Sequence, residues 1–169
     1  MKLLREGDVT EGVEMMAYTF DLEAITDGLI AARRRGGAVR VIVDHRQGMG
    51  NSTKGMKGQA LRLGAAGVEV RVRAGRDLRT VYTRSRKSMG SGIMHAKFLR
   101  VGGSVVVGST NFTTSSQANV ETSVSLLLNE LGVQTFRARF VTEWDGSKAY
   151  AQALADREAG EEQPTPTGD

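Results

Sequence analysis

The sequence predicts an α/β protein with a mixed β-sheet flanked by helices. Between residues 13 and 73, apolar runs of strand length alternate with two helix-like segments in the order β-α-β-α-β, which is typical of a sheet covered by helices. Further along, IMHAKFLRV and SVVVGS are β-rich runs on either side of Gly102 and Gly103, a pattern that indicates a hairpin. A crossover region followed by a hairpin combines parallel and antiparallel pairing, so the sheet is expected to be mixed.

The first two strands and the helix between them have clear signals. Residues 13–19 (VEMMAYT) and 38–45 (AVRVIVDH) predict buried strands. The helix is indicated by an N-cap at Asp21, arginines in its last turn and a stop at Gly36 or Gly37. Its apolar stripe comprises Leu22, Ile25, Leu29 and Ile30.

The middle of the chain continues the alternation. Residues 46–55 (RQGMGNSTKG) predict a Gly/Ser/Asn loop, and we expect His45 to belong to it. A helix through MKGQALRLGAAG closes at Gly67, and residues 68–73 (VEVRVR) form a strand with valine on one face and charge on the other. Residues 75–92 are then a long, basic, Gly/Ser-rich connection.

After the hairpin, the chain has one more strand and a long helix. Residues 120–128 (VETSVSLLL) predict the strand, and the segment from Glu130 to about Ala155 predicts an amphipathic helix that breaks near Gly146. Residues 157–169 carry almost no apolar side chain and are expected to be a disordered tail. The domain is therefore expected to span residues 1–156.

Composition limits the classes of function. The chain has 169 residues, 40% of them hydrophobic and 25% charged, which suits one globular domain. Its net charge of +4 weakly favours an anionic partner such as nucleic acid or an acidic membrane surface. With no cysteine and two histidines, disulfides and cysteine-ligated zinc are excluded, a histidine-rich metal site is disfavoured, and no cofactor is expected.

The sequence has no obvious targeting segment. The start, MKLLREGDVTEG, is too short and too polar for a signal peptide, and no apolar run approaches the roughly 20 residues needed to cross a bilayer. We therefore expect a soluble intracellular protein, cytoplasmic or associated with the mitochondrial surface.

Four polar residues around the hairpin form a candidate phosphate site. Residues two apart on a strand share a face, so His95 and Lys97 should project side by side, and the returning strand should bring Ser109 and Asn111 towards them. Lysine supplies positive charge, and histidine supplies a nucleophile or an acid/base near neutral pH. Glu121 could hydrogen-bond the histidine and fix its tautomer. A His-x-Lys strand or a Gly-Ser-x-Asn turn alone is ordinary structure, and it is their joint spacing that favours metal-free phosphoryl transfer.

The stretch HAKFLRVGGSVVVGSTNF resembles the His-x-Lys…Gly-Ser-x-Asn motif of the phospholipase D superfamily, and residues 15–45 resemble the strand–helix–strand that precedes it in small single-motif members. Those members include bacterial endonucleases of the Nuc type and the mitochondrial cardiolipin hydrolase group. The likeness covers roughly residues 13–145. It implies a phospholipase D-like fold and a two-fold homodimer in which one motif from each subunit meets at a shared active site.

The resemblance also implies roles for the site residues, with no metal or cofactor. His95 of one subunit would attack phosphorus to form a phosphohistidine, and His95 of the partner subunit would protonate the leaving oxygen and then activate water. Lys97 and Asn111 would hold the non-bridging oxygens. Ser109 would support that cradle, and Glu121 would orient His95.

The chain departs from the family pattern in two respects. Gly102 stands where the family has an aspartate, and the spacing to Gly-Ser is one residue shorter. We expect the lost aspartate to loosen the hairpin, and whether it impairs activity stays open. The family also usually begins with a strand and a helix where this chain has about a dozen mostly polar residues, so that pair is expected to be missing.

A basic run lies between Arg71 and Lys87, where seven basic residues face a single acid, Asp77. It leads directly into the strand expected to bear His95, so we expect it to rim the site, although a charge run can also be a solvated face. Tyr82 could stack on a base, or the arginines with apolar neighbours could rest on an anionic bilayer. The substrate-binding candidates are Arg79, Tyr82, Arg84, Arg86 and Lys87.

These observations favour a phosphodiester hydrolase, with nucleic acid as the first substrate class. The runner-up is hydrolysis of a cardiolipin-type phospholipid, a lipid-degrading activity. A third hypothesis, from another class, is an inactive domain that binds anions or RNA through the same cradle.

Overall fold

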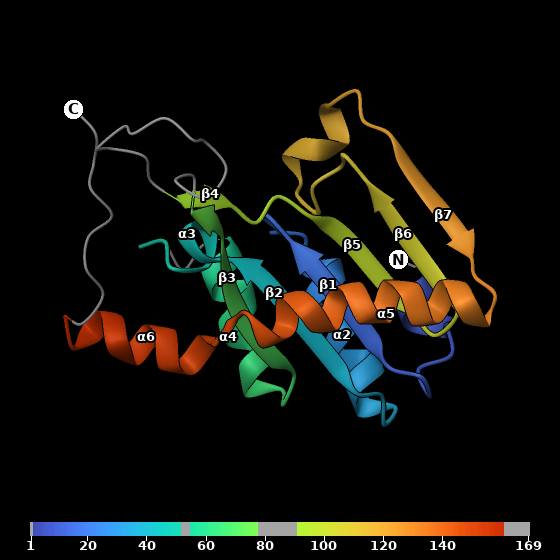
Figure 1. Cartoon of the computed structure of the whole chain (residues 1–169), viewed down its shortest axis with the longest axis horizontal. Coiled ribbons are helices and arrows are strands. Elements are labelled where there is room, and N and C mark those ends of the chain that lie inside the picture. The colour runs from blue at the N-terminus through green and yellow to red at the C-terminus, as the bar shows by residue number, and fades with distance from the viewer. Residues whose placement is uncertain (1, 52–54, 78–90, 161–169) are drawn as a thin grey trace.

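The structure is a computed structural model, and it describes residues 2–51, 55–77 and 91–160. Within these ranges one mixed sheet runs in the order β4-β3-β2-β1-β5-β6-β7, with β8 beside β3 (Figure 1). The pairs β1–β2 and β2–β3 are parallel, whereas β1–β5, β5–β6 and β6–β7 are antiparallel. The predicted α/β fold with a mixed sheet is therefore confirmed. The strands are β1 (Val13–Ala17), β2 (Val39–Asp44), β3 (Glu69–Asp77), β4 (Ser91–Ile93), β5 (Lys97–Val101), β6 (Ser104–Gly108), β7 (Ser123–Leu127) and β8 (Lys148–Ala149).

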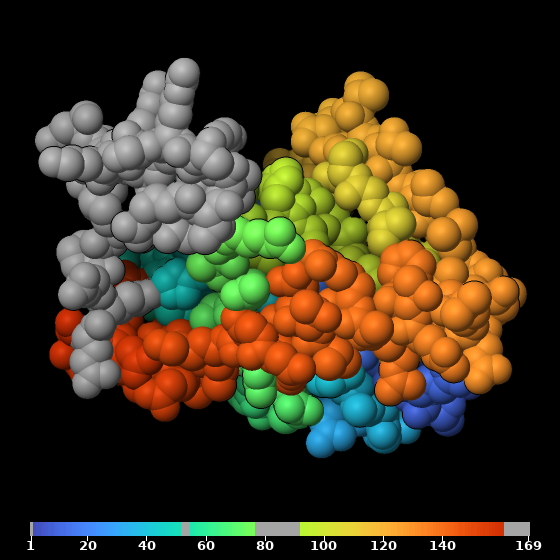
Figure 2. Space-filling model, in the orientation of Figure 1, coloured from blue at the N-terminus to red at the C-terminus, as the bar shows by residue number. Residues whose placement is uncertain are grey.

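Helices cover both faces of this sheet. Leu29 and Leu63, from two of the helices, pack into the larger apolar cluster on one face, and Phe140 and Trp144 pack into a smaller cluster on the other. The helix bearing Phe140 and Trp144 is α5, which crosses the front of the molecule in orange (Figures 1 and 2). The helices are α1 (Lys2–Glu6), α2 (Glu23–Arg34), α3 (His45–Gly48), α4 (Met56–Ala65), α5 (Glu130–Asp145) and α6 (Tyr150–Glu158), and a 3₁₀ turn covers Ser115–Ala118.

A buried ion cluster lies under α5 in the middle of the sheet. Glu14 of β1 is 1% exposed and pairs with Arg100 of β5, which is 0% exposed, at 2.9 Å. The second carboxylate oxygen of Glu14 accepts from Arg40 of β2. Arg100 also donates to the backbone oxygens of Gly102 and Glu11. Because every charge has a partner, these side chains can remain buried between three strands.

Two local predictions in the first half of the chain are wrong. The N-cap of α2 is Leu22, not Asp21, and the Asp21 carboxylate instead accepts from the backbone and hydroxyl of Thr114. The segment predicted as a loop after β2 begins with the short helix α3, so His45 lies in a helix. Asp44 causes this difference, because its side chain accepts from the Gln47 backbone and caps the turn.

The region leading to the hairpin also differs from the prediction. Both ends of the expected connection are strand, since β3 extends to Asp77 and β4 pairs antiparallel with it. The strand predicted to run from residue 93 to residue 101 starts only at Lys97. His95 therefore lies in the extended segment between β4 and β5.

The hairpin between β5 and β6 turns at Gly102, the position where the family has an aspartate. Val101 pairs with Ser104 at the end of the ladder, and Gly102 has a φ of +52°. A Cβ atom at Gly102 would lie 2.7 Å from the Asp8 backbone oxygen. Glycine therefore suits this turn in both conformation and space.

The two ends of the domain frame this sheet. Ahead of β1 the described residues form α1 rather than a strand, and its Leu4 is buried against Gly28 of α2. The predicted break near Gly146 is confirmed, because α5 ends there and β8 and α6 follow. α6 reaches Glu158, and the rest of the predicted tail from residue 161 lies outside the described residues. No helix in the described ranges is both long and apolar enough to span a membrane.

Candidate active site

His95 and Lys97 lie together at the start of β5. The His95 side chain is exposed, whereas Lys97 is 7% exposed. The Lys97 ammonium donates to the backbone oxygen of His95 at 2.9 Å. Burial lowers the pKa of Lys97 from its ordinary value, and the negative charge of Glu121 opposes this shift. An open imidazole therefore lies beside a cation that is partly removed from water.

Tyr18, which directly follows β1, is a site residue that the sequence reasoning missed. Its ring lies 4.7 Å from the His95 ring, tilted by 59°, and the Lys97 ammonium lies 5.1 Å from the centre of the Tyr18 ring. Its backbone N–H donates to the Ala96 oxygen, and its hydroxyl accepts from the Gln47 amide. Tyr18 therefore contacts both the imidazole and the ammonium, and its backbone fixes the segment that carries them. Its place at the carboxyl end of a strand in the family-like stretch was the available signal.

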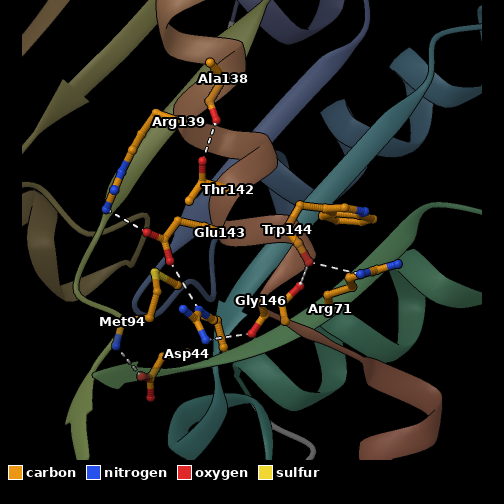
Figure 3. A network of polar contacts seen from close by, with 11 residues as sticks. Asp44, Arg71, Met94, Ala138, Arg139, Thr142, Glu143, Trp144 and Gly146 are labelled. Atoms are coloured by element: carbon orange, nitrogen blue, oxygen red, sulfur yellow. Dashed lines mark hydrogen bonds and ion pairs between the residues drawn. The ribbon is translucent and has the colours of Figure 1, made fainter. Parts of the chain in front are cut away.

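Asp44 holds the other end of the same segment (Figure 3). One carboxylate oxygen accepts from the Met94 backbone N–H at 2.9 Å, and the other caps α3 through Gln47. Asp44 is 1% exposed, so these hydrogen bonds are shielded from water. With Asp44 bonded to residue 94 and Tyr18 to residue 96, the backbone on both sides of His95 is fixed.

Ser109 and Glu121 form a second unit across the hairpin. Phe98 pairs with Val107, so the ladder continues with Gly108 opposite Lys97, and Ser109 follows directly after Gly108 at the end of β6. The Ser109 hydroxyl donates to Glu121 at 2.5 Å, and Asn119 donates to the other oxygen of Glu121 at 3.2 Å. These hydrogen bonds hold the pKa of the Glu121 carboxyl below its ordinary value.

The predicted hydrogen bond from Glu121 to His95 is not present between these two described residues. Its carboxylate accepts from Ser109 and Asn119 instead, and it acts on Lys97 through its charge. The structure thus brings Glu121 to the cation of the site rather than to the imidazole.

Asn111 lies on the loop after β6 and is half-buried. Its amide oxygen is buried and has no hydrogen-bond partner among the described residues. A buried acceptor without a donor costs free energy, and such a group in a native structure calls for an explanation. Asn111 also lines an apolar cavity of about 240 Å³ between α1, α2 and the sheet, with Leu22, Ile25 and Val106.

A family model described as "Cardiolipin synthase, PLD-like domain" matches residues 8–144. The chain belongs to the phospholipase D superfamily. Membership makes it a superfamily hydrolase of phosphodiesters, either a nuclease or a phospholipase D. No curated protein gives a significant match.

Solved structures with the same fold support this assignment. Nuc from Salmonella typhimurium, a phospholipase D family member, aligns with a TM-score of 0.70 and 22% identity over 88% of this chain and 86% of that chain. NucT from Helicobacter pylori aligns at 0.65 and 17% over 82% of this chain and 81% of that chain. TrmBL2, an archaeal chromatin protein with a novel mode of DNA binding, aligns at 0.55 and 14%, covering 88% of this chain and 48% of that one. The family model confirms the predicted superfamily, and these structures confirm the predicted fold.

The predicted basic rim of this phospholipase D-like site lies mostly outside the described residues. That part includes every predicted substrate-binding residue, namely Arg79, Tyr82, Arg84, Arg86 and Lys87. The described part of the run ends in β3, where Arg73 and Arg76 line a cavity with His95. No group of three or more His, Asp or Glu side chains in the described ranges is arranged to hold a metal ion.

Proposed function

We propose that this superfamily member hydrolyses phosphodiesters in nucleic acid through a phosphohistidine at His95, without a metal ion. The observation that carries the proposal is the exposed imidazole of His95, held beside the buried ammonium of Lys97 on a backbone fixed at both ends. A fixed nucleophile next to a cation of low solvent exposure suits attack on an anionic phosphorus centre.

The reaction has two steps. An imidazole nitrogen of His95 attacks phosphorus, the bond to the leaving oxygen breaks, and that oxygen takes a proton from His95 of the partner subunit. The second imidazole then takes a proton from water as the water oxygen attacks phosphorus and the phosphorus–nitrogen bond breaks. Covalent catalysis divides one difficult displacement into two easier ones.

The remaining site residues stabilise the phosphoryl group. Lys97 and Asn111 bind the non-bridging oxygens, and Ser109 supports this cradle. The charge of Glu121 opposes the lowering of the Lys97 pKa by burial, and its carboxylate fixes the Ser109 hydroxyl, a role consistent with its contacts inside one protomer. This replaces the orientation of His95 that the family resemblance implies for Glu121.

A homodimer is part of the proposal, because the mechanism uses two copies of His95. Exposed apolar side chains lie along β7 and at the start of α5, and they provide a surface that a second copy of the chain could cover. This surface begins beside Glu121 and Ser109, so a copy bound there would lie next to the site. Its members are Val120, Val124, Leu126, Leu127 and Leu131.

Nucleic acid is favoured as the substrate by the arginines beside His95. The likeness to Nuc and NucT in fold supports the same choice. Phospholipid hydrolysis is the second candidate, because the apolar cavity beside Asn111 could accept part of an acyl chain and the matching family model is described by cardiolipin synthase.

The experiment that tests the proposal is hydrolysis of a chromogenic phosphodiester in excess EDTA. Wild type, His95→Asn and His45→Asn would be compared, the last removing the only other histidine in the chain. We expect EDTA-resistant turnover in wild type and His45→Asn, and its loss in His95→Asn. Turnover that EDTA abolishes, or that persists in His95→Asn, would contradict the proposal.

A further inference from the structure

A polar cavity of about 260 Å³ opens beside His95. It lies between the end of β3, the segment before β5 and the middle of α5. Arg73, Arg76 and Arg139 line it together with a single acid, Glu143. In Figure 2 the green end of β3 and the orange helix α5 meet on this face of the molecule.

We propose that this cavity is a second anion subsite, which binds the phosphate next to the one that is cleaved. The inference rests on the proposed function, because it takes His95 as the group that attacks the first phosphate. The preferred substrate is then a strand with consecutive phosphates, and a single isolated phosphodiester is a poorer substrate.

The charge of the cavity favours an anion. Three guanidinium groups against one carboxylate leave a net charge of +2 when His95 is neutral. A cavity lined by charge of one sign concentrates the field and attracts a ligand of the opposite sign. The planar fork of a guanidinium also fits two phosphate oxygens at once.

Two of the arginines, Arg73 and Arg139, pair with Glu143, and Figure 3 shows Arg139 and Glu143 side by side on α5. Arg73 donates to Glu143 at 3.2 Å and to the Gly146 backbone oxygen at 2.6 Å. A Cβ atom at Gly146 would lie 3.0 Å from the Arg73 guanidinium, so glycine leaves the space that this side chain fills. Arg73 is thus held between α5 and the turn that follows it.

Arg139 is attached more loosely. It pairs with Glu143 at 2.7 Å one helical turn away, but its side chain is 59% exposed, against 31% for Arg73. An exposed ion pair of this kind contributes little free energy, so Arg139 can exchange its carboxylate partner for a phosphate. Arg73 and Glu143 then remain as the base of the subsite. Arg139 and Arg76 contact the bound phosphate from the side that is open to solvent.

A repeating phosphate chain explains why this subsite would lie beside the nucleophile. In a nucleic acid strand every scissile phosphate has a neighbour, and basic side chains that contact phosphates supply affinity that does not depend on base sequence. A small chromogenic diester reaches only the cradle at Lys97 and Asn111. The subsite should therefore raise kcat/KM for a nucleic acid strand relative to kcat/KM for the small diester.

Binding without turnover tests the inference independently of catalysis. A fluorescent single-stranded oligonucleotide is titrated into His95→Asn protein, alone and combined with Arg139→Gln, and anisotropy gives Kd. Arg62→Gln is the matched control, since Arg62 is an arginine on α4 that pairs with Asp27 away from the cavity. We expect Arg139→Gln to raise Kd about tenfold and to reduce the salt slope by about one, and Arg62→Gln to change Kd less than twofold.

Turnover gives the second readout. In the protein with an intact His95, Arg139→Gln should lower the ratio of kcat/KM for the oligonucleotide to kcat/KM for the chromogenic diester about tenfold. Equal Kd values for Arg139→Gln and Arg62→Gln would overturn the subsite even if hydrolysis proceeds. Binding to phosphatidylcholine–cardiolipin vesicles that depends on Arg139, with no such dependence for the oligonucleotide, would overturn its assignment to nucleic acid. Absent hydrolysis together with Arg139-dependent oligonucleotide binding would sustain the subsite and refute the proposed function.

Discussion

Every residue of β1 is buried, whereas every residue of β7 is exposed, although both strands belong to the same sheet. The difference follows from how each half is covered. In the parallel half, α2 and α4 lie on one face and α5 on the other, because parallel strands need crossover helices. In the antiparallel half a tight turn joins β5 to β6, the loop over residues 109–122 joins β6 to β7, and the sheet ends in an open edge at β7.

The comparison shows that stability and chemistry have different locations in this molecule. The buried ion cluster joins β1, β2 and β5, and the larger apolar cluster packs α2 and α4 against the parallel strands. The site lies where β5 pairs antiparallel with β1, at the boundary of the two halves. His95 therefore takes its rigidity from the parallel half, through Asp44 and Tyr18, and takes its polar partners from the open half.

The largest expected effect concerns the buried ion cluster. Glu14→Gln should lower the free energy of unfolding by about 3–5 kcal/mol, because it leaves Arg100 buried without a counter-charge. Urea denaturation followed by circular dichroism measures the change. Asp27→Asn, which breaks an exposed pair with Arg62, is the control and should cost less than about 1 kcal/mol. Equal losses of unfolding free energy in the two variants would show that the buried cluster stabilises the fold no more than a surface ion pair does.

A pair of apolar substitutions tests the two halves directly. Ile42→Ala in β2 removes a side chain that is 0% exposed and should cost about 2–4 kcal/mol. Leu126→Ala in β7, where the side chain is 42% exposed, should cost less than about 1 kcal/mol per protomer. The same denaturation assay, run at several protein concentrations, measures both. A loss for Leu126→Ala as large as that for Ile42→Ala would break the comparison.

The third prediction concerns the link between the halves. Asp44→Asn places an amide NH₂ against one of two backbone N–H donors, so the segment before His95 loses a fixed contact. We expect kcat to fall about tenfold with KM little changed, because the nucleophile is misplaced rather than the substrate lost. Steady-state kinetics measures both values. If the variant yields less folded protein but each folded molecule keeps the wild-type kcat, the role of Asp44 is only structural.

The smallest effect is a pH shift. Because burial lowers the pKa of Lys97, the protein should lose activity as pH rises through a value below that of an ordinary lysine. Below that value Lys97 is charged and the phosphate cradle is intact. Lys97→Arg keeps the charge to higher pH and should move the alkaline limb of the rate profile upwards, with a lower plateau because a guanidinium differs in shape. An unmoved alkaline limb would exclude Lys97 as the titrating group.

Regular patterns in the sequence account for most of the fold. Strands β1, β2 and β3 and helices α2 and α4 were predicted because hydrophobic periodicity and glycine stops are local signals. The errors arose where a side chain bonds to a distant part of the chain. Aspartate is a common N-cap residue, but the Asp21 carboxylate accepts a hydrogen bond from Thr114, 93 positions away.

The site residues also fall into those with a local sequence signal and those that depend on distant contacts. His95, Lys97 and Ser109 could be proposed because they lie on one hairpin and their spacing is readable. Arg139 had no local signal, since only the packing of α5 brings it to His95. Tyr18 had the signal of its place at a strand end, but only the sheet order brings it to His95. The hydrogen-bond partners of Glu121 within one protomer could not be predicted, because they depend on the conformation of the loop that contains Asn119.

Covalent capture of the intermediate tests the central claim most directly. The protein would be mixed with an excess of phosphodiester in EDTA, quenched rapidly at alkaline pH, digested and analysed by mass spectrometry. The account predicts a phosphoryl adduct on the peptide containing His95, absent from His95→Asn. Turnover without an adduct, or with the adduct on another residue, would contradict the assignment of His95 as the nucleophile.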